Sequence, residues 1–220
     1  MKLKKPKFWD YKKPNLLSYL LFPLTFFIGI NNLFLNSKTK KKYNKITTIC
    51  VGNIYLGGTG KTPTAIKLYQ ILKKLNLNVS TAKKLYNSQL DEKIILEKKT
   101  HLITCNSRNE ILIKNFKNEK KIIIFDDGLQ DRKIRYDMEF VCFDSVNWIG
   151  NGCLIPSGPL RENLTSLKKY DGVFLKGRDG DTNKIISQIK KNNREILVFR
   201  TYYYPSNLKK FDVSEKYLMF

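Results

Sequence analysis

The residues best suited to chemistry form a glycine-rich segment that ends in a lysine and a threonine. The segment reads Gly57-Gly58-Thr59-Gly60-Lys61-Thr62. Glycines adopt backbone torsions closed to other residues, so the amides here can approach phosphate oxygens. Lys61 can reach the outer phosphates of a nucleotide, and the Thr62 hydroxyl can ligate Mg²⁺. The segment predicts a variant phosphate-binding loop, with Tyr55 where the strict pattern has glycine.

A pair of carboxylates is the second candidate. The apolar run Ile122–Phe125 ends in Asp126 and Asp127, followed by a glycine. In phosphate-loop enzymes an acid at the end of such a strand holds or orients Mg²⁺. Adjacent side chains point in different directions, so we expect only one of the two to face the metal. An Asp-Gly turn that only closes the strand is the structural alternative.

A loop rich in glycine and proline, residues 151–162, ends in Arg161 and Glu162. Arg161 could contact a phosphate through two hydrogen bonds, and Glu162 could join the metal shell. A surface salt bridge explains the same two residues equally well on spacing alone.

Short apolar runs alternate with longer segments of mixed apolar and polar residues. This alternation indicates the strands and helices that would position the candidate site residues. Seven runs rich in β-branched residues predict strands: Ile46–Val51, Asn78–Thr81, His101–Cys105, Lys121–Phe125, Glu139–Phe143, Gly172–Leu175 and Glu195–Arg200. Helical spacing of apolar residues predicts helices over Thr62–Leu75 and Asp181–Asn192, with Asp181 as a candidate N-cap. This alternation predicts an α/β fold with a mostly parallel sheet.

The amino-acid composition of the chain further limits the classes of protein to which it can belong. The 220 residues are 42% hydrophobic, which excludes a fully disordered chain and suits one domain with an appendage. Four well-separated cysteines argue against a disulfide framework, and the single histidine, His101, excludes a multi-histidine metal site. The net charge of +22 favours anionic partners such as nucleic acid, anionic lipid or a phosphorylated substrate. The lysines are spread along the chain and no RNA-binding signature accompanies them, so we expect no specific nucleic-acid partner.

The N-terminal segment Leu16–Leu35 contains no charged residue over 20 positions. Pro23 should kink a helix here or start a second one. We rank an interfacial or partly inserted membrane anchor first, a helix buried on the domain second, and a single span last. Lysines flank both ends and would meet the anionic headgroups of a membrane surface.

Together these segments resemble the tetraacyldisaccharide 4'-kinase family, the lipid A 4'-kinases. The resemblance lies in VGNIYLGGTGKTP, FDDGLQ and GNGCLIPSGPLRE, in the family's order, and in Pro23-Leu24 of the apolar segment. It implies a P-loop NTPase-like sheet with flanking helices and a membrane-associated N-terminal helix. The implied reaction is transfer of the ATP γ-phosphate to the 4'-hydroxyl of a lipid-linked disaccharide 1-phosphate. This step of lipid A and lipopolysaccharide biosynthesis takes place at the cytoplasmic face of the bacterial inner membrane.

The resemblance also implies roles for individual residues. It places ATP at Gly57, Gly58, Thr59, Gly60, Lys61, Thr62 and Gln130, and Mg²⁺ at Thr62, Asp127 and Glu162. The catalytic group comprises Asp91, Asp126, Asp127 and Arg161. Within it, Asp91 of Leu90-Asp91-Glu92 is expected to help deprotonate the sugar hydroxyl.

Family members are longer and carry a second α/β domain, of which this chain would hold only the beginning. We expect a basic and apolar membrane-associated segment at 1–42, a P-loop kinase core at 43–200, and a linker with a remnant of the second domain at 201–220. Such a truncation would impair transfer. The open alternatives are a catalytically degenerate ATP- or lipid-binding remnant, a separate chain that supplies the missing half, and a membrane-associated P-loop ATPase of the partitioning type.

Overall fold

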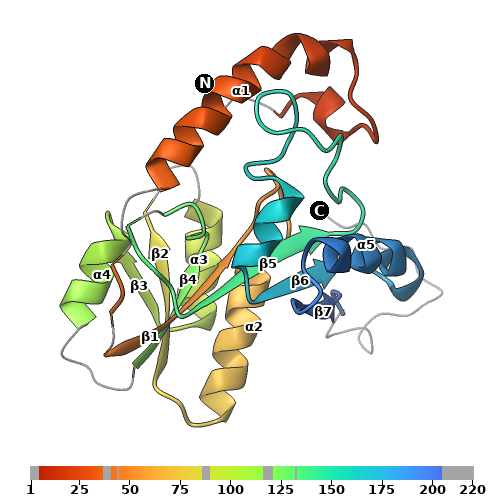
Figure 1. The fold of residues 1–220 in the computed structure, drawn as a ribbon. Coiled ribbons are helices and arrows are strands. Elements are labelled where there is room, and N and C mark those ends of the chain that lie inside the picture. Colours follow the sequence, from red (N-terminus) through yellow and green to blue (C-terminus); the bar gives the residue numbers. More distant parts are fainter. Residues whose placement is uncertain are drawn as a thin grey trace.

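Seven short strands form one parallel sheet in the computed structural model of the chain, which describes residues 5–36, 41–43, 45–85, 90–115, 121–131 and 133–204. The strands are β1 (Ile46–Gly52), β2 (Val79–Lys84), β3 (Leu102–Cys105), β4 (Lys121–Asp126), β5 (Met138–Asp144), β6 (Gly172–Lys176) and β7 (Leu197–Thr201). Their order across the sheet is β3-β2-β4-β1-β5-β6-β7, and the six described strand pairs are parallel (Figure 1). All seven predicted strands are confirmed, with ends that differ by a few residues.

Helices connect and flank these strands. They are α1 (Leu16–Asn36), α2 (Lys61–Lys74), α3 (Leu90–Lys99), α4 (Arg108–Asn115) and α5 (Asp179–Asn192), with short 3-10 helices η1 (Lys7–Asp10) and η2 (Leu164–Lys169). The two predicted helices in the domain are confirmed as α2 and α5. Asp181 is wrong as the N-cap of α5, because the helix already begins at Asp179 and its cap residue is Arg178, with an extended backbone.

The side chains of each strand alternate between two apolar layers. On one face, Phe125 of β4 packs in a cluster with Ile111 of α4 and Ile189 of α5. On the other face, Ile124 of β4 packs in a second cluster with Ala65 of α2. Helices therefore cover both faces of a parallel sheet, which confirms the predicted α/β fold class.

Strand β1 lies between β4 and β5, where the strand order changes direction. The chain leaves β1 through α2 to reach β2 on one side, whereas β5, β6 and β7 follow on the other side. Val51 near the end of β1 lies level with Asp126 at the end of β4. In open parallel sheets a ligand binds outside the carboxyl ends of the strands at this kind of switch point.

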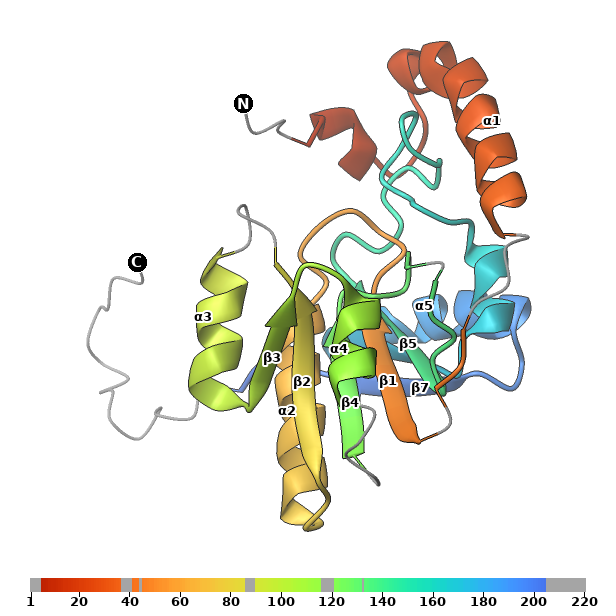
Figure 2. The same ribbon diagram turned by 90° about the vertical axis from the view of Figure 1, so that its left-hand side faces the viewer.

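Helix α1 turns polar side chains toward the protein and apolar side chains outward. Ser18 and Thr25 are 1% and 8% exposed. Asn151 donates a hydrogen bond to the Ser18 hydroxyl (3.0 Å), and the Thr25 and Ser157 hydroxyls share another (2.7 Å). Large apolar side chains of the helix stay exposed: Leu16, Leu17, Tyr19, Leu20, Phe22, Leu24, Phe26 and Phe27. Figures 1 and 2 show α1 beyond one end of the sheet, next to the loop that follows β5.

The helix continues through Pro23, so the alternative in which a second helix starts there is wrong. Pro23 is exposed, and its ring therefore meets solvent rather than a packed core. Among the described residues, no helix combines the length and the apolar character needed to span a bilayer.

Candidate active site

The phosphate loop occupies the turn between β1 and α2. Gly60 precedes the helix with φ 84° and ψ 20°, a left-handed conformation that glycine adopts at the least cost. In the described structure α2 has no side-chain hydrogen bond at its N-cap and no acidic residue in its first turn. Its first N–H groups and the positive end of its dipole are therefore available to an anion. The Thr59 hydroxyl beside them is buried and has no hydrogen-bond partner in the described part of the chain.

Tyr55, which replaces the glycine of the strict pattern, ties the loop to the N-terminal segment. Its hydroxyl donates a hydrogen bond to Asp10 (2.6 Å), and the Lys5 ammonium bonds to both of these side chains. Burial and the neighbouring Asp10 raise the pKa of Tyr55, so its hydroxyl stays protonated as a donor. A Cβ at position 57 would lie 2.8 Å from the Tyr55 ring, so glycine is needed at that position.

Asp126 is fully buried at the end of β4 and faces the first turn of α2. Its Oδ2 accepts hydrogen bonds from the Thr62 hydroxyl (2.9 Å) and from Lys83 (2.8 Å). Burial raises the pKa of Asp126, although Lys83 and Thr62 oppose that shift. Burial would lower the pKa of Lys83, but attraction to Asp126 and Glu92 outweighs it and raises the pKa, so the ammonium stays charged. The acid in contact with Thr62 is thus Asp126.

Asp127, which we expect on the metal with Thr62, lies between two cations. Its Oδ1 is 3.9 Å from Lys61 Nζ and 3.5 Å from Arg161 Nη1. The backbone of Asp127 is left-handed (φ 62°), a conformation that aspartate tolerates better than most residues. Arg161 donates to Gln130 Oε1 (2.8 Å), and Gln130 in turn donates to a carbonyl of the loop after β1 (2.9 Å). Gln130 therefore positions Arg161.

Lys61, Asp127 and Arg161 meet in one cavity of 880 Å³ beside the phosphate loop. Its described lining consists of Lys5, Pro6, Trp9, Leu56, Gly57, Gly58, Thr59, Gly60, Lys61, Thr62, Pro63, Glu92, Ile95, Asp127, Arg161 and Tyr203. The structure thus brings the predicted phosphate loop together with Asp127 and Arg161. The N-terminal residues Lys5, Pro6 and Trp9 contribute to its lining.

The side chains beside the loop fit a magnesium ion that arrives with a nucleotide. Mg²⁺ takes oxygen ligands and is usually held by one or two carboxylates together with substrate phosphates. The Thr62 hydroxyl contacts Asp126, whose second oxygen is buried without a hydrogen-bond partner in the described structure. No cluster of three or more His, Cys, Asp or Glu side chains suited to a metal occurs among the described residues. A metal here would need phosphate oxygens to complete its coordination.

Four predicted site residues lie outside the described lining of this cavity: Asp126, Gln130, Asp91 and Glu162. Asp91 is exposed in the first turn of α3, whereas its neighbour Glu92 lines the cavity. Adjacent residues of a helix point about 100° apart, so the two do not share one direction. Glu162 accepts hydrogen bonds from the Tyr170 hydroxyl (3.0 and 3.1 Å). The role of Asp91 as a base and that of Glu162 as a metal ligand stay predictions.

Two residues that contact the aspartates of the candidate site were missed by sequence reasoning. Lys83 lies on a strand whose other residues are mostly buried, and a lysine at the carboxyl end of such a strand is the signal that could have found it. Arg108 begins α4, donates to the backbone carbonyl of Asp127 and pairs with Asp131 (3.3 Å). No local motif marks Arg108, because its partners lie on a separate loop.

Comparison with known proteins agrees with this arrangement. The family model described as tetraacyldisaccharide-1-P 4'-kinase matches residues 16–105 and 87–218. The tetraacyldisaccharide 4'-kinase of Pelagibacter ubique is 48% identical over 220 residues, which are 100% of this chain and 70% of the relative. The enzyme of the same name from Rickettsia bellii is 34% identical over 196 residues, with coverage of 81% and 60%.

The fold also matches a solved structure. The crystal structure of LpxK from Aquifex aeolicus in complex with ATP has a TM-score of 0.61 and 19% identity, and the match covers 91% of this chain and 86% of that one. At this identity the match establishes a shared fold. From the family match and the extent of the identity to its curated relatives, we conclude that the chain belongs to the tetraacyldisaccharide 4'-kinase family.

Proposed function

We propose that this chain transfers the γ-phosphate of ATP to the 4'-hydroxyl of a tetraacyldisaccharide 1-phosphate. The observation that carries the proposal is the 880 Å³ cavity in which the phosphate loop faces Asp127 and Arg161. Membership of the family supports the choice of acceptor. The chain spans 70% and 60% of the two curated relatives described above, so the activity of the whole enzyme is proposed here rather than transferred from them.

Phosphoryl transfer requires positioning and charge neutralisation more than covalent chemistry. The amides of the phosphate loop bind the phosphates, and Lys61 and Arg161 approach them from two sides. Asp127 holds these two cations in place, at 3.9 and 3.5 Å. A bound Mg²⁺ would supply further neutralisation, and Thr62 with Asp126 are the residues placed to hold it.

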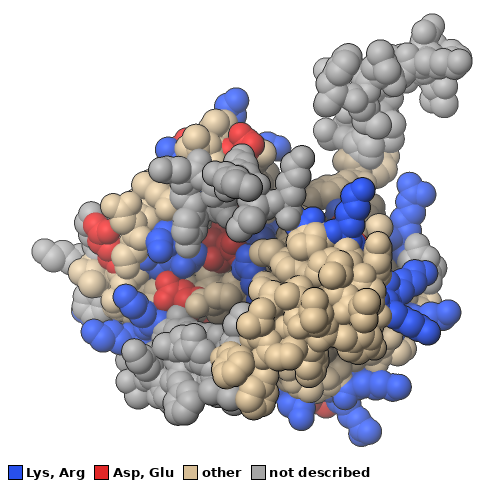
Figure 3. Space-filling view, turned by 90° about the horizontal axis from the view of Figure 1, so that it is seen from above, with Lys and Arg blue, Asp and Glu red and all other residues tan. Residues whose placement is uncertain are grey.

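We also propose that α1 lies at the surface of an anionic bilayer, with its exposed apolar side chains in the interface. The polar side chains Ser18 and Thr25 are buried against the protein, so the apolar face of α1 is turned outward. Exposed Lys12, Lys13, Lys41 and Lys42 flank the helix and would meet anionic headgroups. Lys and Arg side chains are otherwise scattered over the face seen in Figure 3. The loop that contacts α1 also leads to Arg161, so a lipid acceptor held near α1 would lie close to the cavity.

A transfer assay tests the proposed reaction. ATP labelled at the γ-phosphate is incubated with the chain, Mg²⁺ and tetraacyldisaccharide 1-phosphate in mixed micelles, and labelled lipid is measured. We expect labelled lipid with the chain and at least about 100-fold less with Arg161→Ala, because a cation that stabilises the transition state is lost. Arg178→Ala, at the N-cap of α5, is the matched control. ATP hydrolysis without labelled lipid would contradict the kinase assignment and favour an ATPase.

A further inference from the structure

The phosphate loop is attached to the N-terminal segment through Tyr55, whose side chain is 1% exposed. The Tyr55 hydroxyl donates a hydrogen bond to Asp10 (2.6 Å) at the end of η1, and Lys5 bonds to both side chains. The Lys5 ammonium also lies 4.4 Å from the centre of the Tyr55 ring. Burial raises the pKa of Asp10, but the hydrogen bonds from Lys5 and Tyr55 outweigh it and lower the pKa. Tyr55 therefore donates to a charged carboxylate, which makes this hydrogen bond a strong one.

A backbone pairing extends this attachment from Tyr55 to Arg161. The residues before the phosphate loop run antiparallel to the end of the loop after β5, with Tyr55 opposite Leu160. The Arg161 N–H donates to the Ile54 carbonyl (2.7 Å). The backbone of Arg161 is thus fixed against the same short segment that Asp10 holds.

Trp9 attaches the N-terminal segment to the loop that leads to Arg161. Its side chain is 7% exposed, and its indole N–H donates to the Pro156 carbonyl (2.9 Å). Its own carbonyl accepts a hydrogen bond from the Asn151 N–H (3.0 Å). A Cβ at position 150 would lie 2.1 Å from that carbonyl oxygen, so glycine is needed there for the close approach. We call Lys5–Asp10 the N-terminal brace, because it contacts both the phosphate loop and the loop that ends in Arg161.

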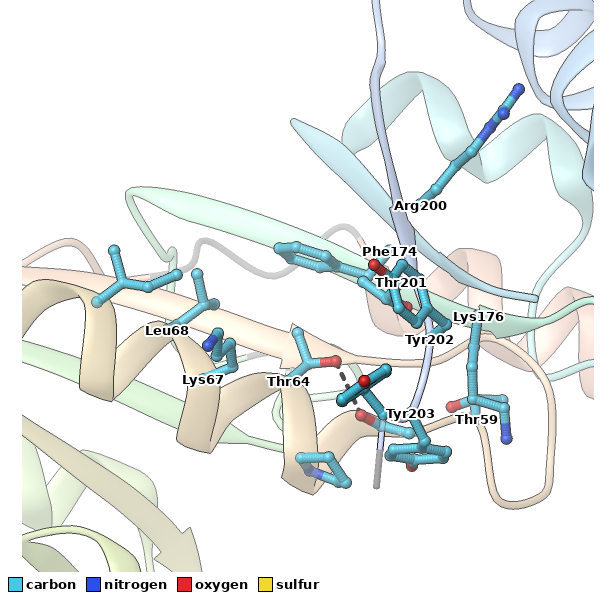
Figure 4. Close-up of a pocket in the computed structure, with 14 residues that line it drawn as sticks. Thr59, Thr64, Lys67, Leu68, Phe174, Lys176, Arg200, Thr201, Tyr202 and Tyr203 are labelled. Atoms are coloured by element: carbon cyan, nitrogen blue, oxygen red, sulfur yellow. Dashed lines mark hydrogen bonds between the residues drawn. The ribbon is translucent and has the colours of Figure 1, made fainter. Parts of the chain in front are cut away.

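Tyr55 and Asp10 line neither of the two cavities beside the phosphate loop in the described structure. One is the 880 Å³ cavity described above, and the other, of 480 Å³, lies beside Thr59 and Thr64 (Figure 4). Loss of the hydrogen bond between Tyr55 and Asp10 would therefore act on the position of the loops rather than on a direct contact with a ligand.

We propose that Tyr55 and Asp10 are positioning residues for the phosphoryl transfer. Their hydrogen bond holds the phosphate loop and Arg161 in the relative placement that the transferred phosphate requires. Misplacement of such groups by about 1 Å can lower a rate about 100-fold. The inference rests on the proposed phosphotransfer and gives the segment before α1 a part in it.

A double-mutant cycle tests this hydrogen bond. Tyr55→Phe and Asp10→Ala each remove it, and we expect each to weaken MgATP binding about threefold to tenfold and to lower kcat about tenfold. The double variant should lose no more than either single variant, because both changes remove one shared interaction. Asp10→Asn keeps an acceptor for the Tyr55 hydroxyl and should bind MgATP within about twofold of the unmodified chain. Tyr11→Phe, which removes a hydroxyl from an exposed tyrosine next to the brace, should change neither quantity.

Three measurements on each variant separate positioning from stability. Calorimetry gives the MgATP affinity, the labelled-lipid assay gives kcat, and denaturant unfolding gives the stability. A contact that only stabilises the fold would lower the midpoint of unfolding and leave affinity and kcat unchanged, which would overturn the inference. Losses that add up in the double variant would overturn it as well, because the two side chains would then act separately.

The same measurements separate the inference from the function on which it rests. If the unmodified chain binds MgATP but transfers no phosphate, the proposed transfer fails, and the MgATP affinities of the variants still decide whether the contact positions the phosphate loop. If the unmodified chain binds no MgATP, the proposed function and the inference both fail.

Discussion

Asp126, at the end of β4, joins that strand to the first turn of α2, because its carboxylate accepts a hydrogen bond from Thr62. Its carboxylate is fully buried and accepts hydrogen bonds from Thr62 and Lys83, on α2 and β2. A charge buried in this way requires partners, because an uncompensated one costs several kcal/mol. These hydrogen bonds therefore stabilise the domain and also hold the carboxylate where a metal would bind.

Replacement of Thr62 tests the metal role of this contact. Thr62→Val keeps the shape of the side chain but removes the hydroxyl that contacts Asp126. We expect its affinity for MgATP to fall at least about tenfold, the lower range for losing a group that holds or orients a metal. Thr62→Ser retains the hydroxyl and should bind within about threefold of the unmodified chain. Equal affinities for the two variants would rule out a role for this hydroxyl, and titrations with and without Mg²⁺ make the comparison.

Replacement of Lys83 tests the buried ion pair. Lys83→Met leaves the Asp126 carboxylate buried without its cation, so we expect the free energy of unfolding to fall by about 3–5 kcal/mol. Lys98→Met, on the exposed side of α3, should change it by less than about 0.5 kcal/mol. Denaturant unfolding of both variants gives the two values. Similar stability in both would show that Lys83 contributes little to the fold.

At the scale of elements, α1 departs most from the usual rule that a helix buries its apolar side chains and exposes its polar ones. Its large apolar residues are exposed in the described structure, while its buried positions carry hydroxyl groups bonded to Asn151 and Ser157. A helix that served only the core would show the opposite arrangement. Contact with a bilayer surface, as proposed above, would cover the exposed face.

Co-sedimentation with vesicles tests the membrane role of α1. The double variant Leu20→Asp/Phe27→Asp places two charges where the side chains are 73% and 68% exposed, so the fold should be retained. We expect its partition onto vesicles with anionic phospholipids to fall at least about tenfold, because two apolar anchors are lost. Leu75→Asp, at the exposed C-terminal end of α2, should partition like the unmodified chain. Unchanged partition of the double variant would mean that α1 is not the membrane contact.

The elements also show how far sequence reasoning reaches. The strands were predictable because helices bury both faces of a parallel sheet, so that its strands appear in the sequence as continuous runs of apolar, β-branched residues. Helices α3 and α4 were not predicted. Ile94 and Ile95 of α3 remain 47% and 46% exposed, so its apolar stripe is weak, and α4 spans only 8 residues.

At the scale of the molecule, the site combines short motifs that can be recognised in the sequence with contacts between separate segments that cannot. The phosphate loop and the two aspartates are contiguous motifs, and both were predicted. Which of the two aspartates contacts Thr62 follows from the chain direction at the end of β4, where Asp127 is left-handed and its carbonyl accepts a hydrogen bond from Arg108. The hydrogen bond of Tyr170 to Glu162, eight residues earlier, likewise depends on how η2 folds back between them. Such contacts arise only when the chain folds, so spacing along the sequence cannot reveal them.

The most direct measurement is a calorimetric titration of MgATP into the chain and into Lys61→Ala, with Lys74→Ala at the far end of α2 as the control. Lys61 lines the cavity and lies 3.9 Å from Asp127, so its loss should remove the main cation for the outer phosphates. We expect saturable binding to the chain and to Lys74→Ala, and no measurable binding to Lys61→Ala. Unchanged affinity in Lys61→Ala would contradict the assignment of this cavity as the phosphate site.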